Sequence, residues 1–209
     1  MFSNIKVKNK CKRKFRLSGE SGAGFTMIEL IIAIFVLTVA VIGVYGAFSM
    51  MVITTAQMSD RFTASYLAQE GIEVVRNIRD NNWLQENDWR CGLTDLPEGA
   101  GECSVGNQDF SQNTGGAEAD YKTGTSVGTG LTPYGASGRY LKLDSSNSNN
   151  FYNYLSGSDT KLKRRIIINT VNDYIIQVLV TVSWDEKSTI INPNGQNSIT
   201  AEEYLYNWY

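Results

Sequence analysis

The 209-residue sequence contains no histidine, only three cysteines and only three prolines. The absence of histidine removes the commonest general base and the commonest metal ligand. The chain also lacks a G-x-S-x-G motif, a phosphate-binding glycine loop and a C-x-x-C pair. We therefore expect no enzyme, no cofactor and no metal site. An enzyme based on two carboxylates is the one catalytic alternative.

Positive charge is scarce outside the first 24 residues. That segment holds seven basic residues against Glu20 alone, whereas the remainder holds 12 basic and 20 acidic residues. A basic leader before an acidic body is typical of membrane proteins, because basic segments stay on the cytoplasmic side. Nucleic acid is not an expected partner of the body, since phosphate binding needs clustered positive charge.

Charge of either sign is absent from Leu30 to Ser59, and Leu30–Phe48 is almost continuously apolar. This run is long enough to cross a bilayer, which requires about 20 residues as a helix. Glu29 lies at its start, where a carboxylate in hydrocarbon costs about 3 kcal/mol. The sequence therefore predicts a membrane-spanning helix, and the presence of Glu29 at its start needs a physical justification.

Proline does not occur from Phe25 to Leu96. Beyond the apolar run, apolar residues recur at helical spacing and charged residues take the opposite side. The pattern predicts one helix from about Phe25 to about Asp80, apolar all round at first and then amphipathic, with flexible points at Gly43 and Gly46. The predicted apolar face comprises Phe62, Tyr66, Leu67, Gly71, Val74, Val75 and Ile78, and the polar face Arg61, Glu70, Glu73, Arg76 and Arg79.

Strands are predicted near the C-terminus, where β-branched residues gather. RRIIINTV (164–171) and YIIQVLVTVSW (174–184) flank a turn at Asn172-Asp173. A further hairpin is predicted in KSTIINPNGQNSIT around Asn194-Gly195, and RYLKLD and FYNYL are weaker strand candidates. The fold class is therefore α+β, a long N-terminal helix packed on a C-terminal antiparallel sheet. One face of the second strand is predicted to lie on the core: Tyr174, Ile176, Val178, Val180, Val182 and Trp184.

The cysteines divide between the leader and the body. Cys11 lies among the basic residues, and Cys91 and Cys103 lie in the acidic part. If the leader is removed, an even pair remains, and an oxidising compartment would join it as a disulfide. Two unpaired buried thiols are the alternative.

The order of segments differs from that of a secretory signal, because the small residues precede the apolar run. The stretch Gly24–Leu30 (GFTMIEL) strongly resembles the cleavage and methylation motif of type IV prepilins, in which Gly, Phe and Thr are followed by a hydrophobic pair, Glu, Leu and a spanning helix. LAQEGIEVVRNIRDNNW (67–83), VTVSW and YLYNWY also resemble minor pilins.

The resemblance implies a pilin-like fold and a defined processing pathway. A prepilin peptidase, a membrane aspartic protease that faces the cytoplasm, would cleave between Gly24 and Phe25 and then N-methylate Phe25. In the filament, Glu29 of one subunit would pair with the Phe25 amine of its neighbour and fix the register.

The resemblance also implies the partners and the location. The partners would be other pilin subunits, the prepilin peptidase, the membrane, and a pilus or secretion assembly platform. The precursor would span the cytoplasmic (inner) membrane once, with its head outside the cytoplasm, before it enters an extracellular filament. The size and the loop-rich head favour a minor pilin over a major one, and a type II secretion pseudopilin is the alternative filament subunit.

The predicted segments follow from these features. Residues 83–160 are rich in Gly, Ser and Asn, which predicts an irregular connection. The segments are a cleaved leader (1–24), a transmembrane and filament-core helix (25–54), its amphipathic continuation (55–82), a loop region with the cysteine pair (83–160) and an antiparallel sheet (161–209).

Three other interpretations of the N-terminal region stay open. A signal-anchored protein could carry Glu29 at the membrane edge. Ordinary signal peptidase could cut near Thr54-Thr55-Ala56, although the apolar run is too long for such a signal. A surface adhesin or binding module could be tethered by the same helix and recognise a ligand through residues 92–160.

Each of three weaker patterns has both a structural and a functional interpretation. The basic stretch Lys161–Arg165 predicts the solvated start of a strand rather than a DNA-binding patch. Asp144 and the polar residues after it predict a turn rather than a calcium site, because one carboxylate is too few. The C-terminal aromatic residues predict a strand that caps the core rather than a sugar-binding platform: Tyr204, Tyr206, Trp208 and Tyr209.

Overall fold

A computed structural model describes residues 24–96, 103, 108–124, 130–146, 150–186 and 195–208. The predicted leader up to residue 23, with Cys11, and residues 187–194 of the predicted hairpin lie outside the described residues. The chain divides into two compact units, Met1–Val52 and Ile53–Tyr209. We refer to Phe25–Val52 as the apolar segment and to Ile53–Tyr209 as the head.

One helix, α1 (Met27–Leu84), contains both the apolar segment and the first part of the head. Thr26 caps its start, because the Thr26 Oγ1 accepts a hydrogen bond of 3.3 Å from the Glu29 amide. Its end is a Schellman motif: Asn87 N donates to Asn82 O and Glu86 N to Trp83 O, with Glu86 at a φ of 58°. The predicted helix is confirmed, and it ends at Leu84 rather than near Asp80.

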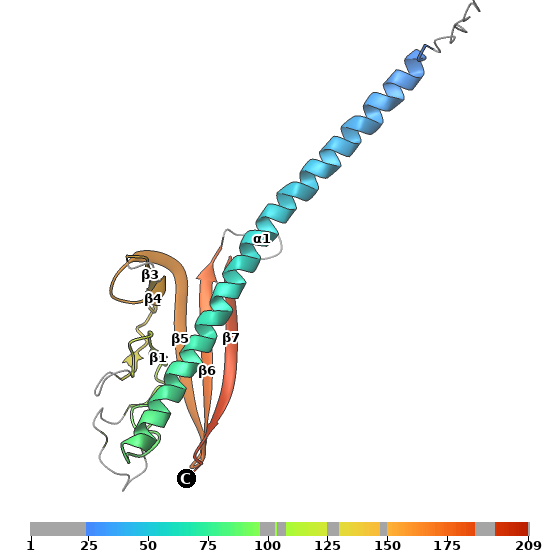
Figure 1. The fold of residues 1–209 in the computed structure, drawn as a ribbon. Helices are drawn as coiled ribbons and strands as arrows, with labels where there is room; N and C mark the ends of the chain where they lie inside the picture. The colour runs from blue at the N-terminus through green and yellow to red at the C-terminus, as the bar shows by residue number, and fades with distance from the viewer. Residues whose placement is uncertain are drawn as a thin grey trace, which may run out of the picture. The chain divides into compact units, whose positions relative to one another are not determined.

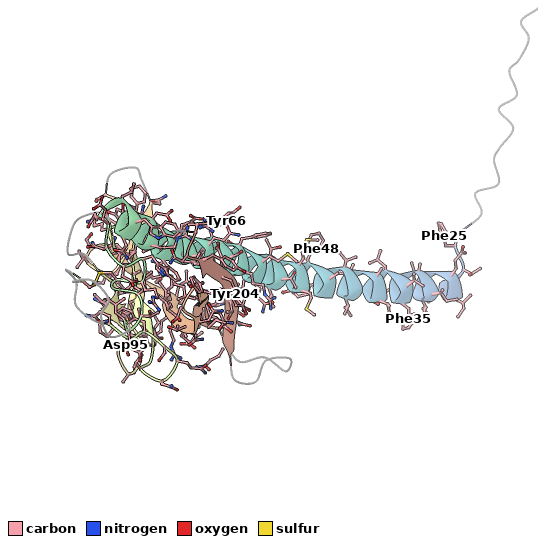
Figure 2. All side chains as sticks on the ribbon, turned by 90° about the horizontal axis from the view of Figure 1, so that it is seen from below. Phe25, Phe35, Phe48, Tyr66, Asp95 and Tyr204 are labelled. Atoms are coloured by element: carbon pink, nitrogen blue, oxygen red, sulfur yellow. A yellow bond between two sulfur atoms is a disulfide. The ribbon has the colours of Figure 1, made fainter. Side chains whose placement is uncertain are left out.

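The apolar segment is uncovered in the structure. Its large apolar side chains, from Phe25 to Val52, are 53 to 84% exposed. In Figure 2, Phe35 and Phe48 project outward from the helix. Among the described residues, α1 is the one helix long and apolar enough to cross a membrane. An uncovered apolar surface of this size is typical of a membrane-spanning segment or of a protein interface.

The strands of the head form one antiparallel sheet (Figure 1). Its centre is β5, which pairs with β6 along one edge and with β1 and β3 along the other; β6 pairs with β7. The predicted α+β class is confirmed. The strands are β1 (Ala117–Glu118), β2 (Thr132–Pro133), β3 (Tyr140–Asp144), β4 (Phe151–Asn153), β5 (Ser158–Asn172), β6 (Ile175–Asp185) and β7 (Gln196–Tyr206).

The strand predictions are largely confirmed. The turn at Asn172-Asp173 joins β5 to β6, and the two weaker candidates are β3 and β4. The hairpin prediction is wrong about pairing: β7 pairs with β6, with Gln196 opposite Asp185. The short strands β1 and β2 lie in the region predicted to be irregular, and the sequence gives no signal for them.

The core lies between the sheet and the head part of α1. Alternate residues of β5 and β6 are buried, because successive side chains of a strand point to opposite faces. The predicted apolar face of β6 is confirmed except for Tyr174, which is exposed in the turn. The helix contributes Ala64, Leu67, Ala68, Gly71, Ile72, Val74, Val75 and Ile78.

Two parts of the predicted helix face are wrong. Phe62 and Tyr66 are exposed, whereas Arg79 is buried. The Arg79 guanidinium lies 4.7 Å from the ring centre of Trp83 and 5.1 Å from that of Trp208. Two indole faces can replace water around a guanidinium, which permits a charge at this buried position.

Gly71 lies where α1 approaches β6 closely. A Cβ atom at Gly71 would be 2.7 Å from Val180 Cγ1 and 3.3 Å from Arg164 Cδ. We expect Gly71→Ala to lower the free energy of unfolding by about 1–2 kcal/mol. Overpacking costs about 1–3 kcal/mol, more than the roughly 1 kcal/mol that alanine gains within a helix.

Urea unfolding of the full chain in detergent, followed by tryptophan fluorescence, measures this effect. Gly46→Ala is the matched control, because no atom lies within 4 Å of a Cβ at that position. A Gly71→Ala protein as stable as the Gly46→Ala control would contradict the close approach.

Candidate functional site

The predicted cleavage junction is accessible. Gly24, Phe25 and Thr26 lie outside the helix and are exposed, and no atom lies within 4 Å of a Cβ at Gly24. Because Thr26 caps α1, the Gly24–Phe25 bond lies in non-helical chain just before the first turn. The bond is therefore accessible without unwinding of the helix.

Glu29 lies in the first turn of α1, on an exposed face. Thr26 and Glu29 have the spacing of a capping box, and a carboxylate near a helix N-terminus is favoured by the helix dipole. The T-x-x-E signal is present in the sequence, but the sequence prediction did not use it. Glu29 therefore has a local role at the helix start, whatever its partner in an assembly.

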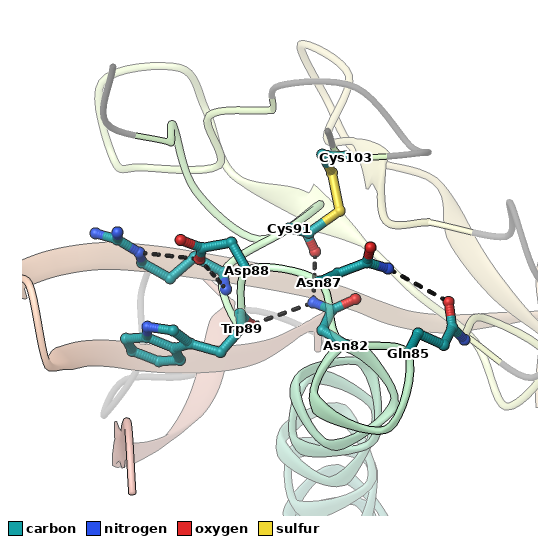
Figure 3. Close-up of a disulfide and its surroundings, with 8 residues drawn as sticks. Asn82, Gln85, Asn87, Asp88, Trp89, Cys91 and Cys103 are labelled. Atoms are coloured by element: carbon teal, nitrogen blue, oxygen red, sulfur yellow. Dashed lines mark hydrogen bonds and ion pairs between the residues drawn. A yellow bond between two sulfur atoms is a disulfide. The ribbon is translucent and has the colours of Figure 1, made fainter. Parts of the chain in front are cut away.

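The predicted disulfide is confirmed. Cys91 and Cys103 are joined, with their Cα atoms 5.5 Å apart (Figure 3). The Asn82 side chain donates hydrogen bonds to Trp89 O (3.2 Å) and Cys91 O (2.8 Å). These contacts attach the chain after α1 to the last turn of the helix. A disulfide agrees with a head outside the cytoplasm.

We expect neither thiol to react in the exported protein. Alkylation of the unreduced, denatured protein, followed by peptide mass spectrometry, should label neither Cys91 nor Cys103. Reduction should then expose both, and it should lower the free energy of unfolding by about 2–4 kcal/mol. Labelling of both cysteines without reductant would refute the pairing.

Arg164, on β5, is fully buried, and its guanidinium joins three elements. Nη1 donates to Leu67 O of α1 (3.0 Å), and Nη2 donates to Ala119 O, just after β1. Nη1 also lies 3.4 Å from Glu70 Oε1. The predicted solvation of this residue is therefore wrong. Buried ion pairs of this kind are sensitive to the loss of either partner.

The other basic residues of this stretch also have partners within the head. Lys161 forms an ion pair with Asp60 (2.5 Å), Lys163 donates to Ser137 O (2.8 Å), and Arg165 donates to Gly115 O (2.7 Å). Lys161 is thus paired with a carboxylate, whereas Lys163 and Arg165 bind neutral carbonyl oxygens.

A second buried charge fixes the glycine-rich region. Glu118 is buried, and its carboxylate accepts hydrogen bonds from the amide (2.7 Å) and the Nε (2.5 Å) of Arg139. The Arg139 guanidinium also lies 4.6 Å from the ring centre of Tyr154. Burial raises the pKa of the Tyr154 hydroxyl to about 12. The contact therefore joins β1 to the chain before β3, within the predicted loop region.

The Asp144 turn is confirmed for the described residues. Ser146 donates to its carboxylate through both N (3.0 Å) and Oγ (2.6 Å), and Ser156 donates through Oγ (2.8 Å). These bonds, led by that of the Ser146 hydroxyl, lower the pKa of Asp144 to about 2. The carboxylate is thus already used by the turn. Within the described ranges, no three histidine, cysteine or acidic side chains could hold a metal ion.

Tyr204 and Tyr206 lie on β7, but they do not cap the core. Leu205 is the buried residue of this stretch, and Tyr204 and Tyr206 lie half-exposed on the opposite face of β7. Trp208 contacts Trp83, with ring centres 5.9 Å apart. Tyr209 lies outside the described residues. Parity along the strand decides the outcome: Leu205 takes the core position between the two tyrosines.

The chain has a pilin-like topology: one long N-terminal helix, apolar at first and then packed on an antiparallel sheet. No family model matches the sequence, and no curated protein or solved structure matches it either. Three features of the chain point to its function: the Gly24–Leu30 motif, the uncovered apolar segment and the disulfide-bonded head.

Proposed function

We propose that this protein is a structural subunit, most simply a minor one, of a type IV pilus-like filament. The observation that carries the proposal is the apolar segment, which is uncovered, helical from Met27 onward, and begins at an accessible Gly24–Phe25 junction. A helix of this kind can be held by lipid before assembly and by neighbouring helices after it. The disulfide-bonded head would remain outside the cytoplasm at both stages.

Processing would prepare the subunit for assembly. Prepilin peptidase would remove residues 1–24 and N-methylate Phe25, which would then carry a positive amine beside the first turn of α1. Glu29 is the one acidic residue in the apolar segment. It would pair with the Phe25 amine of a neighbouring subunit, and a buried charge pair of this kind fixes the register.

Packing of the apolar segments would hold the filament together. In an apolar environment, association depends on close packing, which small residues permit. Gly43 and Ala47 are four residues apart, and no atom lies within 4 Å of a Cβ at Gly43. Another helix can therefore approach this face closely.

A shearing experiment tests the proposal. Filaments sheared from cells should contain the processed protein together with other pilin subunits, and the membrane pool should contain the remainder. Wild-type protein found only in the membrane fraction would contradict a filament subunit and would favour a tethered adhesin. Peptide mass spectrometry of the co-purified subunits would separate a pilus from a secretion pseudopilus.

A further inference from the structure

A polar groove lies on the open face of the sheet, opposite the face that packs on α1. Along β6 the even-numbered residues from Ile176 to Trp184 are buried in the core, and the odd-numbered residues point to the open face. The groove encloses about 390 Å³ and is lined by residues of β5, β6, β7 and the chain between β2 and β3. In Figure 1, α1 lies along one face of these strands. The volume of the groove is within the range of ligand sites in proteins.

The floor of the groove is a row of polar side chains at matched positions on three strands. Lys163 of β5 pairs with Ser183 of β6, and Ser183 pairs with Ser198 of β7. Neighbouring strands lie about 4.8 Å apart, so these side chains stand side by side across the sheet. Next to them, the hydroxyls of Thr181 and Thr200 bond each other at 2.9 Å. In the part of the chain that the structure describes, the hydroxyls of Ser183 and Ser198 have no partner, so both can bind a ligand.

Lys163 provides a positive charge that forms no ion pair with any described carboxylate. Its ammonium donates to Ser137 O (2.8 Å) and lies 4.4 Å from the ring centre of Tyr140. An ammonium group has three donors, so two N–H groups remain. Lys161 also lines the groove, but it is paired with Asp60 (2.5 Å). Lys163 is therefore the residue of the groove that can bind a carboxylate of a ligand.

The other side chains of the groove suit a ligand that is rich in hydroxyl groups. The Asp185 carboxylate accepts hydrogen bonds, and the serine hydroxyls both donate and accept them. Tyr134 adds an aromatic ring, which offers an apolar surface and a polar hydroxyl together. A phosphate backbone fits less well, because Asp185 would repel it and Lys163 alone would attract it. The combination of acceptors, donors, one unpaired cation and an aromatic ring is that of a carbohydrate site.

We propose that this groove binds an acidic carbohydrate, such as a chain of uronic acids. The carboxylate of a sugar ring would meet Lys163, and its hydroxyls would meet Ser183 and Ser198. The site lies entirely within the head, so it goes beyond the proposed filament role and does not depend on assembly. A head with this site would hold the protein to a carboxylated polysaccharide outside the cell.

Calorimetric titration of the full chain in detergent tests the proposal. The probes are oligosaccharides of galacturonate and of alginate, and we expect saturable binding at a single site. The methyl ester of the galacturonate probe keeps the ring and most hydroxyls but removes the charge, so it should bind at least about tenfold more weakly. Duplex DNA should bind more weakly than the acidic sugars. Failure of both acidic probes to bind, equal binding of the ester, or equally tight binding of DNA would overturn the proposal.

Two substitutions place the binding in the groove. Lys163→Gln should weaken binding of the acidic sugar about tenfold, the usual effect of losing a charged hydrogen bond. Lys142→Gln is the matched control: it removes the same charge from a strand lysine outside the groove, which pairs with Asp159 at 3.8 Å. Ser198→Leu, at an exposed position of β7, should obstruct the groove and weaken binding similarly. The urea unfolding curves of the three variants check that the head is folded.

The control decides between a site and a general effect of charge. Equal weakening by Lys163→Gln and Lys142→Gln would contradict a site in the groove, and so would unchanged binding by Ser198→Leu. Both readouts use the isolated chain. Absence of the wild-type protein from filaments would therefore contradict the proposed function and leave this inference standing.

Discussion

Replacing Arg164 with alanine should lower the free energy of unfolding of the head by about 3–5 kcal/mol, because it breaks a buried charged contact by removing one partner. The Arg164 guanidinium binds Leu67 O, Ala119 O and Glu70 at once. Its loss leaves a cavity and an unpaired Ala119 carbonyl between α1, β1 and β5. Since the free energy of unfolding of a domain is about 5–15 kcal/mol, the head of this variant should be only marginally stable. Urea unfolding of the full chain in detergent measures the change.

Arg165→Ala is the matched control for this prediction. Arg165 is the next residue of β5 and points to the other face, where it donates one hydrogen bond to Gly115 O. We expect it to lower the free energy of unfolding by about 1 kcal/mol or less. If the two variants lose equal stability, the buried contact does not have the assigned role.

Two features of the sequence give opposite predictions for the burial of Arg164. Period-two alternation places it on the same face of β5 as Ile166 and Ile168, which are buried. Its charge predicts a solvent-exposed side chain, whereas the alternation predicts a buried one. Alternation was correct, because the backbone carbonyls of α1 and of the chain after β1 replace water around the guanidinium. These partners are distant in sequence, so no local pattern reveals them.

The long helix, the main strands and the disulfide could be predicted because their signals are local. The sequence predicts less accurately which face of α1 packs on the sheet. Around residues 58–67 apolar residues occupy both sides of the helix, so Phe62 and Leu67 give the same periodic signal. Only the approach of β6 at Gly71 decides which side is buried. The Glu118–Arg139 contact is likewise invisible in sequence, since it joins residues within an irregular region.

The second large effect concerns Glu29. We expect the Glu29→Gln protein to be synthesised, processed and held in the membrane, but to be poorly incorporated into filaments. Glutamine keeps the size and the hydrogen-bonding capacity but leaves the neighbour's Phe25 amine buried without a counter-charge, at about 3–5 kcal/mol per pair. The amount of unassembled protein in the membrane should not fall, because loss of a charge eases insertion into the bilayer. The measurement is the ratio of filament-associated to membrane-associated protein after shearing.

Thr26→Ala separates pairing from helix capping. The Thr26 hydroxyl caps the Glu29 amide, so its removal weakens the helix start by about 1 kcal/mol but leaves the carboxylate in place. If Glu29 acts through the neighbouring amine, Thr26→Ala should assemble nearly as well as wild type. If the two variants assemble equally poorly, Glu29 acts through the cap. Normal assembly of Glu29→Gln would show that the charge is not needed.

The N-terminus of the mature protein is the most direct test of the filament-subunit assignment. Intact-mass and N-terminal peptide analysis of protein from the membrane and from sheared filaments should show a chain that begins with N-methyl-phenylalanine at Phe25. Gly24→Val should retain the leader, because a branched side chain at the junction hinders the peptidase. A wild-type chain that begins at Met1, or after Ala56, would contradict the account.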